Sequence, residues 1–155
     1  MKPETTDGFN VQINPDQFGT TYVGPVYMGA QAQKLHVVFD TGSDWLVLEG
    51  DKCKECQGDT FNGNISGVKL SEEPKERKYG SVILVGDEYE DRVCLDKTNP
   101  ETCLNKFKYY LVGQSKKRGS YRGMVEPVDG LMGMSRPELP DHLHNKKKLA
   151  KPIPY

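Results

Sequence analysis

Short apolar runs separated by turn-forming residues are the main pattern along this chain. Val, Ile, Tyr and Phe gather in brief segments bounded by Gly, Pro, Asn and Asp, which is typical of β-strands. No long segment repeats apolar residues with the 3.6-residue period of an amphipathic helix. The sequence therefore predicts an all-β domain. The strands expected are residues 21–28, 34–39, 45–48, 81–85, 89–95 and 107–112, with a short apolar segment at 128–134.

The connections between these strands differ in character. Residues 81–85 and 89–95 are predicted to form a hairpin that turns at Gly86-Asp87, because Gly and Asp favour tight turns. The other expected segments are loops with short strands at 50–78, a basic loop at 113–124 and a short helix at 141–149.

Length and composition suit one domain with a polar extension. The 155 residues include 16 Gly and 10 Pro and only 35% hydrophobic residues, which fits short strands and many turns. We assign residues 1–20 to a polar N-terminal extension and residues 21–155 to the domain. The net charge of −1 gives no strong attraction to nucleic acid or to an anionic membrane. No apolar run approaches the roughly 20 residues of a membrane-spanning helix.

Four cysteines lie in two close pairs. We predict disulfides Cys53–Cys56 and Cys94–Cys103, because each pair is local and closes a loop. Zinc is the alternative for the first pair, but the spacing of the second pair is too loose for the usual zinc site. Disulfides favour an oxidising compartment, secreted or lysosomal/vacuolar, although Met1 to Asn10 shows no signal-peptide core.

An acidic motif follows one of the predicted strands. Asp40-Thr41-Gly42-Ser43 comes directly after an apolar run that is expected to be interior. Gly42 lets the backbone turn and lets another chain approach closely, while Thr41 and Ser43 offer hydroxyls that can orient the carboxylate. Taken alone, the tetrapeptide is equally compatible with an ordinary turn.

Five further features occur in order around this motif. They are Tyr22-Val23-Gly24; the turn of Gly29 and Ala32-Gln33; Trp45-Leu46-Val47 with the Cys53 and Cys56 loop; Tyr79-Gly80-Ser81; and Val128-Asp129-Gly130-Leu131-Met132-Gly133. Together with Asp40 to Ser43, this order resembles the N-terminal lobe of the pepsin-like aspartic peptidases. The resemblance runs from residue 22 to residue 133.

The resemblance implies a two-lobed endopeptidase whose two aspartates share a proton and activate a water molecule. Asp40 would be one catalytic aspartate, supported by Thr41, Gly42 and Ser43. Tyr79, Gly80 and Ser81 would belong to a β-hairpin flap that closes over a peptide or protein substrate. No metal ion or organic cofactor is implied.

The printed sequence departs from the family in two respects. It holds no second Asp-Thr/Ser-Gly, and Asp129-Gly130 belongs to the packing segment instead. We expect the other aspartate to come from a C-terminal lobe, a separate chain or a second copy of Asp40 at a two-fold axis. The flap also lacks one Gly before Ser81. The competing hypothesis is a non-catalytic peptide-binding or assembly subunit.

The resemblance also predicts specific neighbours. Asp40 should lie on a tight loop beside residues 128–133, with Leu131 and Gly133 packed against the flanks of that loop. The Tyr79 ring should lie over the cleft within reach of Trp45. His36, which shares the strand with Asp40, is expected to be a packed or surface histidine.

Overall fold

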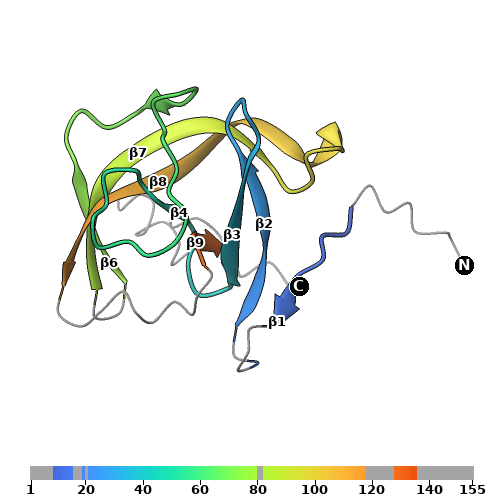
Figure 1. The fold of residues 1–155 in the computed structure, drawn as a ribbon, viewed down its shortest axis with the longest axis horizontal. Helices are drawn as coiled ribbons and strands as arrows, with labels where there is room; N and C mark the ends of the chain where they lie inside the picture. Colours follow the sequence, from blue (N-terminus) through green and yellow to red (C-terminus); the bar gives the residue numbers. More distant parts are fainter. Residues whose placement is uncertain (1–8, 16–18, 20, 80–81, 118–127, 136–155) are drawn as a thin grey trace, which may run out of the picture.

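A computed structural model describes residues 9–15, 19, 21–79, 82–117 and 128–135, and Figure 1 shows their path. Their regular elements are β-strands apart from one short 3-10 helix, so the predicted all-β class is confirmed. No helix in these residues is long and apolar enough to cross a membrane. The elements are β1 (Asn14–Pro15), β2 (Tyr22–Met28), β3 (Gln33–Asp40), β4 (Leu46–Glu49), β5 (Val68–Lys69), β6 (Lys75–Tyr79), β7 (Val82–Cys94), η1 (Pro100–Thr102), β8 (Cys103–Lys117) and β9 (Gly130–Gly133).

The strands bond to one another in a ring. The order is β2–β3–β9–β4–β8–β7, and β7 pairs again with β2. The pairs β3–β9 and β4–β8 are parallel, whereas the other pairs in the ring are antiparallel. Figure 1 shows β7 and β8 arching together over the remaining strands. Closing the ring leaves its strands paired on both sides, and β9 is thereby held between β3 and β4.

Apolar side chains are buried on both faces of β4 and β8. Leu46 and Leu48 belong to an inner cluster, whereas Val47 between them belongs to an outer cluster. On β8, Tyr109 belongs to the inner cluster and Tyr110 to the outer cluster, since successive side chains of a strand point to opposite faces. The inner cluster is Val26, Met28, Leu35, Val37, Leu46, Leu48, Phe61, Tyr89, Val93, Tyr109, Leu111 and Met132. The outer cluster is Val47, Cys53, Leu84, Tyr110 and Val112.

The prediction of a hairpin that turns at Gly86-Asp87 is wrong, because β7 continues through both residues as one strand. Its register with β8 shifts between Val85 and Gly86, which marks a β-bulge or irregularity. A Cβ at position 86 would lie 2.1 Å from the carbonyl oxygen of Leu111. Gly86 is therefore the residue that allows the close approach of β8, and its turn-forming tendency is overridden by pairing with a distant segment.

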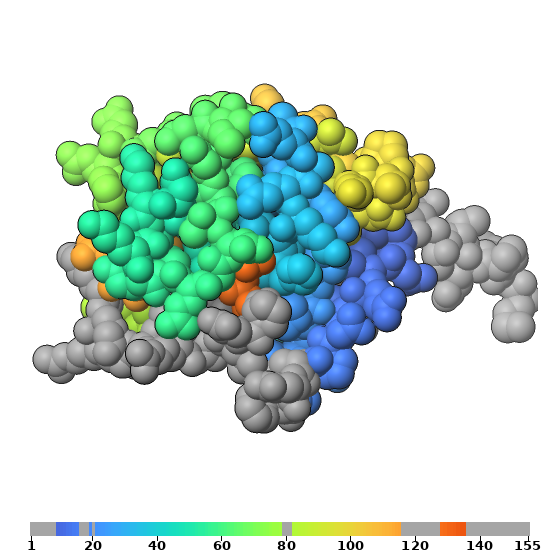
Figure 2. All heavy atoms as spheres, viewed as in Figure 1, coloured from blue at the N-terminus to red at the C-terminus, as the bar shows by residue number. Residues whose placement is uncertain are grey.

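Strand β8 is longer than the predicted 107–112, because it pairs with β7 along nearly its whole length. Residues 113–117, expected in a loop, thus lie in a strand, while the rest of that loop and the helix expected at 141–149 are outside the described residues. Within the polar extension, β1 pairs with β2. Residues 50–67, between β4 and β5, spread in green over the near face in Figure 2.

Both predicted disulfides are confirmed. Cys53 bonds to Cys56 with 5.4 Å between their Cα atoms. Cys94 and Cys103 lie opposite each other in β7 and β8, and their Cα atoms are 4.0 Å apart. The four cysteines of the chain are therefore all used in disulfides.

Candidate active site

Strand β9 holds both ends of the loop that begins at Asp40. Asp40 ends β3 and is the register partner of Gly133. The Met134 amide donates to the Asp40 carbonyl at 2.7 Å, and the Gly133 amide donates to the Trp45 carbonyl at 2.8 Å. Leu131 pairs with β3 on one side and with β4 on the other. The predicted position of Asp40 beside residues 128–133 is confirmed.

Gly133 is required by the close approach of this loop. A Cβ at position 133 would lie 2.5 Å from the Trp45 nitrogen and 2.6 Å from the Asp44 nitrogen. These neighbours are backbone atoms, so they cannot move aside as a flexible side chain can. The loop and β9 are thus fitted to each other without space for a methyl group.

Replacing Gly133 by Ala is expected to lower the free energy of unfolding by about 1–3 kcal/mol, since the added methyl group overpacks the loop. Urea denaturation followed by circular dichroism measures this change. Gly113→Ala is the matched control, because the nearest atom to a Cβ there is 3.7 Å away. Equal stability of the two variants would contradict the tight fit at Gly133.

The carboxylate of Asp40 is oriented by its own turn. Its Oδ1 accepts a hydrogen bond from the Gly42 amide at 3.0 Å. Thr41 and Gly42 are exposed and Asp40 is half-buried, so the carboxyl group lies at the surface of the lobe. Ser43 Oγ is buried and has no hydrogen-bond partner within the described residues. The turn therefore presents one oriented carboxylate beside a hydroxyl whose hydrogen-bonding capacity is unused there.

The predicted flap corresponds to β6 and β7. These consecutive strands are antiparallel, and Tyr79 is the register partner of Val82. Gly80, Ser81 and the side chain of Tyr79 lie outside the described residues, so the expected approach of Tyr79 to Trp45 stays a prediction. Trp45 instead contacts Arg77, whose guanidinium carbon is 4.1 Å from the centre of the indole ring.

Two buried acids, Glu49 and Asp129, were not singled out as functional residues in the sequence analysis. Glu49 is 2% exposed and its Oε2 accepts from the Gly58 amide at 2.7 Å. Asp129 is 3% exposed, and its carboxylate accepts from the amides of Asp59 and His36, each at 2.7 Å. Glu49 directly follows the apolar run Leu46 to Leu48, and Asp129 belongs to the packing segment that the resemblance identified. Asp129 thus ties the segment after β4 to strand β3.

Burial raises the pKa of Glu49 to about 7, with a smaller contribution from the negative charge of Asp129. The hydrogen bond from Gly58 opposes this shift because it stabilises the ionised form. His36 Nδ1 lies 3.7 Å from Asp129 Oδ2, and the His36 side chain is 44% exposed. His36 is therefore a partly exposed partner of Asp129, as expected for a packed or surface histidine.

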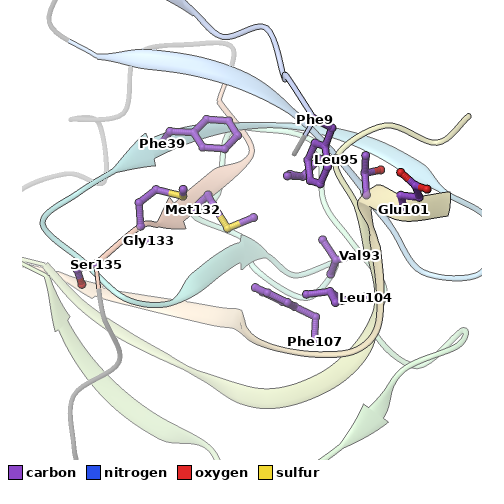
Figure 3. Close-up of a pocket in the computed structure, with 12 residues that line it drawn as sticks. Phe9, Phe39, Val93, Leu95, Glu101, Leu104, Phe107, Met132, Gly133 and Ser135 are labelled. Atoms are coloured by element: carbon purple, nitrogen blue, oxygen red, sulfur yellow. The ribbon is translucent and has the colours of Figure 1, made fainter. Parts of the chain in front are cut away.

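A mainly apolar cavity of about 410 Å³ borders β9 and the end of β3 (Figure 3). Glu101 is the charged residue in its lining, and Asp40 is not part of that lining. The lining residues are Phe9, Phe39, Val93, Leu95, Glu101, Thr102, Leu104, Phe107, Met132, Gly133, Met134 and Ser135. The cavity therefore lacks the carboxylate chemistry of the Asp40 loop, although both contact the same strand.

Comparisons with known proteins agree with this arrangement. A search of curated proteins found no match to the chain. The family model described as eukaryotic aspartyl protease matches residues 21–147, which include β2 to β9 and the Asp40 loop. The chain therefore belongs to the eukaryotic aspartyl protease family.

Proposed function

We propose that this chain is one lobe of an aspartic endopeptidase and that Asp40 supplies one of its two catalytic carboxyl groups. The observation that carries the proposal is the position of Asp40. It ends β3, its turn is fixed by β9, and its carboxylate accepts from the Gly42 amide. Thr41 and Gly42 are exposed, so a substrate can reach this carboxylate from solvent.

The proposed reaction needs a second aspartate opposite Asp40. Two carboxyl groups at short distance share one proton, because ionising both brings like charges together. The ionised group removes a proton from water, and the water oxygen bonds to the peptide carbonyl carbon. The protonated group donates to the carbonyl oxygen. Proton transfer to the amide nitrogen then allows the C–N bond to break, giving a carboxyl group and an amine.

We propose that a companion lobe, rather than this lobe alone, completes the site. Within the described residues, Asp40 has no carboxylate partner across the turn, and the hydrogen-bonding capacity of Ser43 Oγ is unused. A buried hydroxyl without a partner is unusual, and a contact from another segment would satisfy it. A C-terminal lobe, a separate chain or a second copy could supply the missing aspartate, and the assay below distinguishes a second copy from a companion lobe.

The proposed substrate is an extended peptide. Among the described strands, β6 pairs only with β7, so its other edge retains backbone groups that an added strand can use. Arg77 of the same strand lies over the ring of Trp45, which follows the Asp40 loop. The two disulfides support work in an oxidising compartment of the secretory pathway.

A peptidase assay at acidic pH tests this proposal. The purified monomer, any dimer and a mixture with a C-terminal lobe of the same family are compared, with and without a statine-type inhibitor. We expect no turnover by the monomer and inhibitor-sensitive cleavage by an assembled form. Cleavage by the monomer would overturn the need for a second lobe. An assembled form that binds the inhibitor without turnover would favour the non-catalytic peptide-binding subunit.

A further inference from the structure

Arg77 lies between two aromatic rings where β6 passes the Asp40 loop. Its guanidinium carbon is 4.1 Å from the ring centre of Trp45 and 5.1 Å from that of Tyr110. Tyr110 is fully buried in the outer cluster, and Trp45 packs against the same cluster. A planar guanidinium attracts the faces of such rings and stacks on them, which an ammonium group cannot do in the same way.

A carboxylate fixes the orientation of this guanidinium. Arg77 Nη2 donates to Glu88 Oε1 at 3.0 Å, and Glu88 lies on the neighbouring strand β7. Lys75 Nζ reaches the same oxygen at 3.3 Å. Arg77 Nε is buried without a hydrogen-bond partner in the described part of the chain. Both the ion pair and the ring contacts therefore hold the side chain in place.

The same cluster anchors the backbone of the β6–β7 hairpin. The Tyr110 hydroxyl contacts the carbonyl oxygen of Lys75 on β6 and that of Leu84 on β7. Arg77 is the register partner of Leu84, and its guanidinium group also contacts Trp45. Trp45 is itself fixed through its carbonyl oxygen by the Gly133 amide. A continuous set of contacts thus runs from the hairpin to the loop of Asp40.

We propose that Arg77 is a positioning residue that fixes the β6–β7 hairpin relative to the Asp40 loop through its contact with Trp45. This role rests on the proposed peptidase function. Because Arg77 stands two residues before the end of β6, its contact determines how the hairpin lies beside the loop. Peptide binding should depend on this position more than the chemical step does, since Arg77 has no contact with Asp40 among the described residues.

Trp45 makes the proposal measurable without any catalytic assay, because it is the only tryptophan of the chain. Its quenching by acrylamide reports how well the indole ring is covered. Arg77→Met removes the charge and the planar group, while Arg77→Lys keeps only the charge. Lys75→Met is the matched control, because Lys75 shares the Glu88 partner and lies 54% exposed on the same strand.

We expect Arg77→Met to raise the quenching constant of Trp45 about twofold, Arg77→Lys to give an intermediate value and Lys75→Met to match the original chain. In an active assembly, Arg77→Met should raise KM about tenfold and change kcat less than twofold. Unchanged quenching in both Arg77 variants, or kinetics of Arg77→Met equal to those of Lys75→Met, would overturn the role of Arg77. An assembly inactive even with Arg77 would overturn the peptidase function instead, and the quenching of Trp45 would still decide whether Arg77 positions the hairpin.

Discussion

Replacing Asp40 by Asn is expected to lower kcat/KM of the assembled enzyme by about 10³-fold or more, with little change in thermal stability. The amide keeps the size of the side chain, and its oxygen can still accept from the Gly42 amide. It can neither take a proton from water nor transfer one to the substrate, so the pair of carboxyl groups is lost. Initial rates at acidic pH measure the loss of kcat/KM, and melting temperatures of the same samples measure the thermal stability.

Asp51→Asn is a suitable control for this change, because Asp51 is an exposed acid just after β4 and outside the Asp40 loop. It should retain the original activity. If Asp40→Asn keeps its activity while both variants remain folded, Asp40 is not the catalytic carboxyl group and the chemistry must lie elsewhere.

The free energy of unfolding is expected to decrease as the pH rises from about 4.5 to above 7, because Glu49 favours its protonated form in the fold. Its pKa is 4.5 when unshifted and about 7 in the structure. The contribution of Glu49 to the free energy of unfolding is therefore fully present below pH 4.5 and is lost as the pH passes through about 7. A shift of this size corresponds to a loss on the order of 3 kcal/mol.

Glu49→Gln should remove most of this pH dependence, because the amide oxygen can accept from Gly58 while the ionisation is gone. Urea denaturation at several pH values between 4 and 8 measures the slope of the free energy of unfolding against pH. This slope is more informative than the absolute stability of the variant. Asp129, Asp59 and His36 are the other titratable groups around this site. Glu73→Gln, at an exposed position, should keep the original slope. An unchanged slope in Glu49→Gln would contradict the role of Glu49.

This pH response agrees with the proposed chemistry. A pair of aspartates that share a proton acts at acidic pH, where one can remain protonated while the other is ionised. Glu49 favours the folded lobe in the same range. A neutral buried carboxyl group at the end of β4, close to Asp129, is thus compatible with a protein that works in acid and loses stability as the pH rises.

Local sequence signals were sufficient for the part of the site that is built from consecutive residues. The apolar run before Asp40 predicted β3, and the apolar segment with Gly133 predicted the strand beside it. The ordered motifs made it possible to predict which of these segments lie together. The two disulfides also followed from local spacing.

Features that depend on distant segments could not be predicted in this way. Gly86-Asp87 carries a turn signal, but pairing with β8 keeps it inside a strand. Glu49 is an acid that a local pattern places at the surface, and its burial depends on the packing of residue 58 around it. Asp129 lay in the predicted packing segment, but its hydrogen bond from residue 59 comes from a distant part of the chain. Arg77 becomes significant only because the fold brings Trp45 and Tyr110 to it.

The pH dependence of kcat/KM in the assembled form tests the central claim most directly, namely that Asp40 acts as half of a pair of aspartates. Two coupled carboxyl groups predict a bell-shaped profile with its maximum on the acidic side of neutral, because protonating both or ionising both stops the reaction. A single limb that rises to a plateau above neutral pH would contradict the account and would indicate a base with the properties of a histidine.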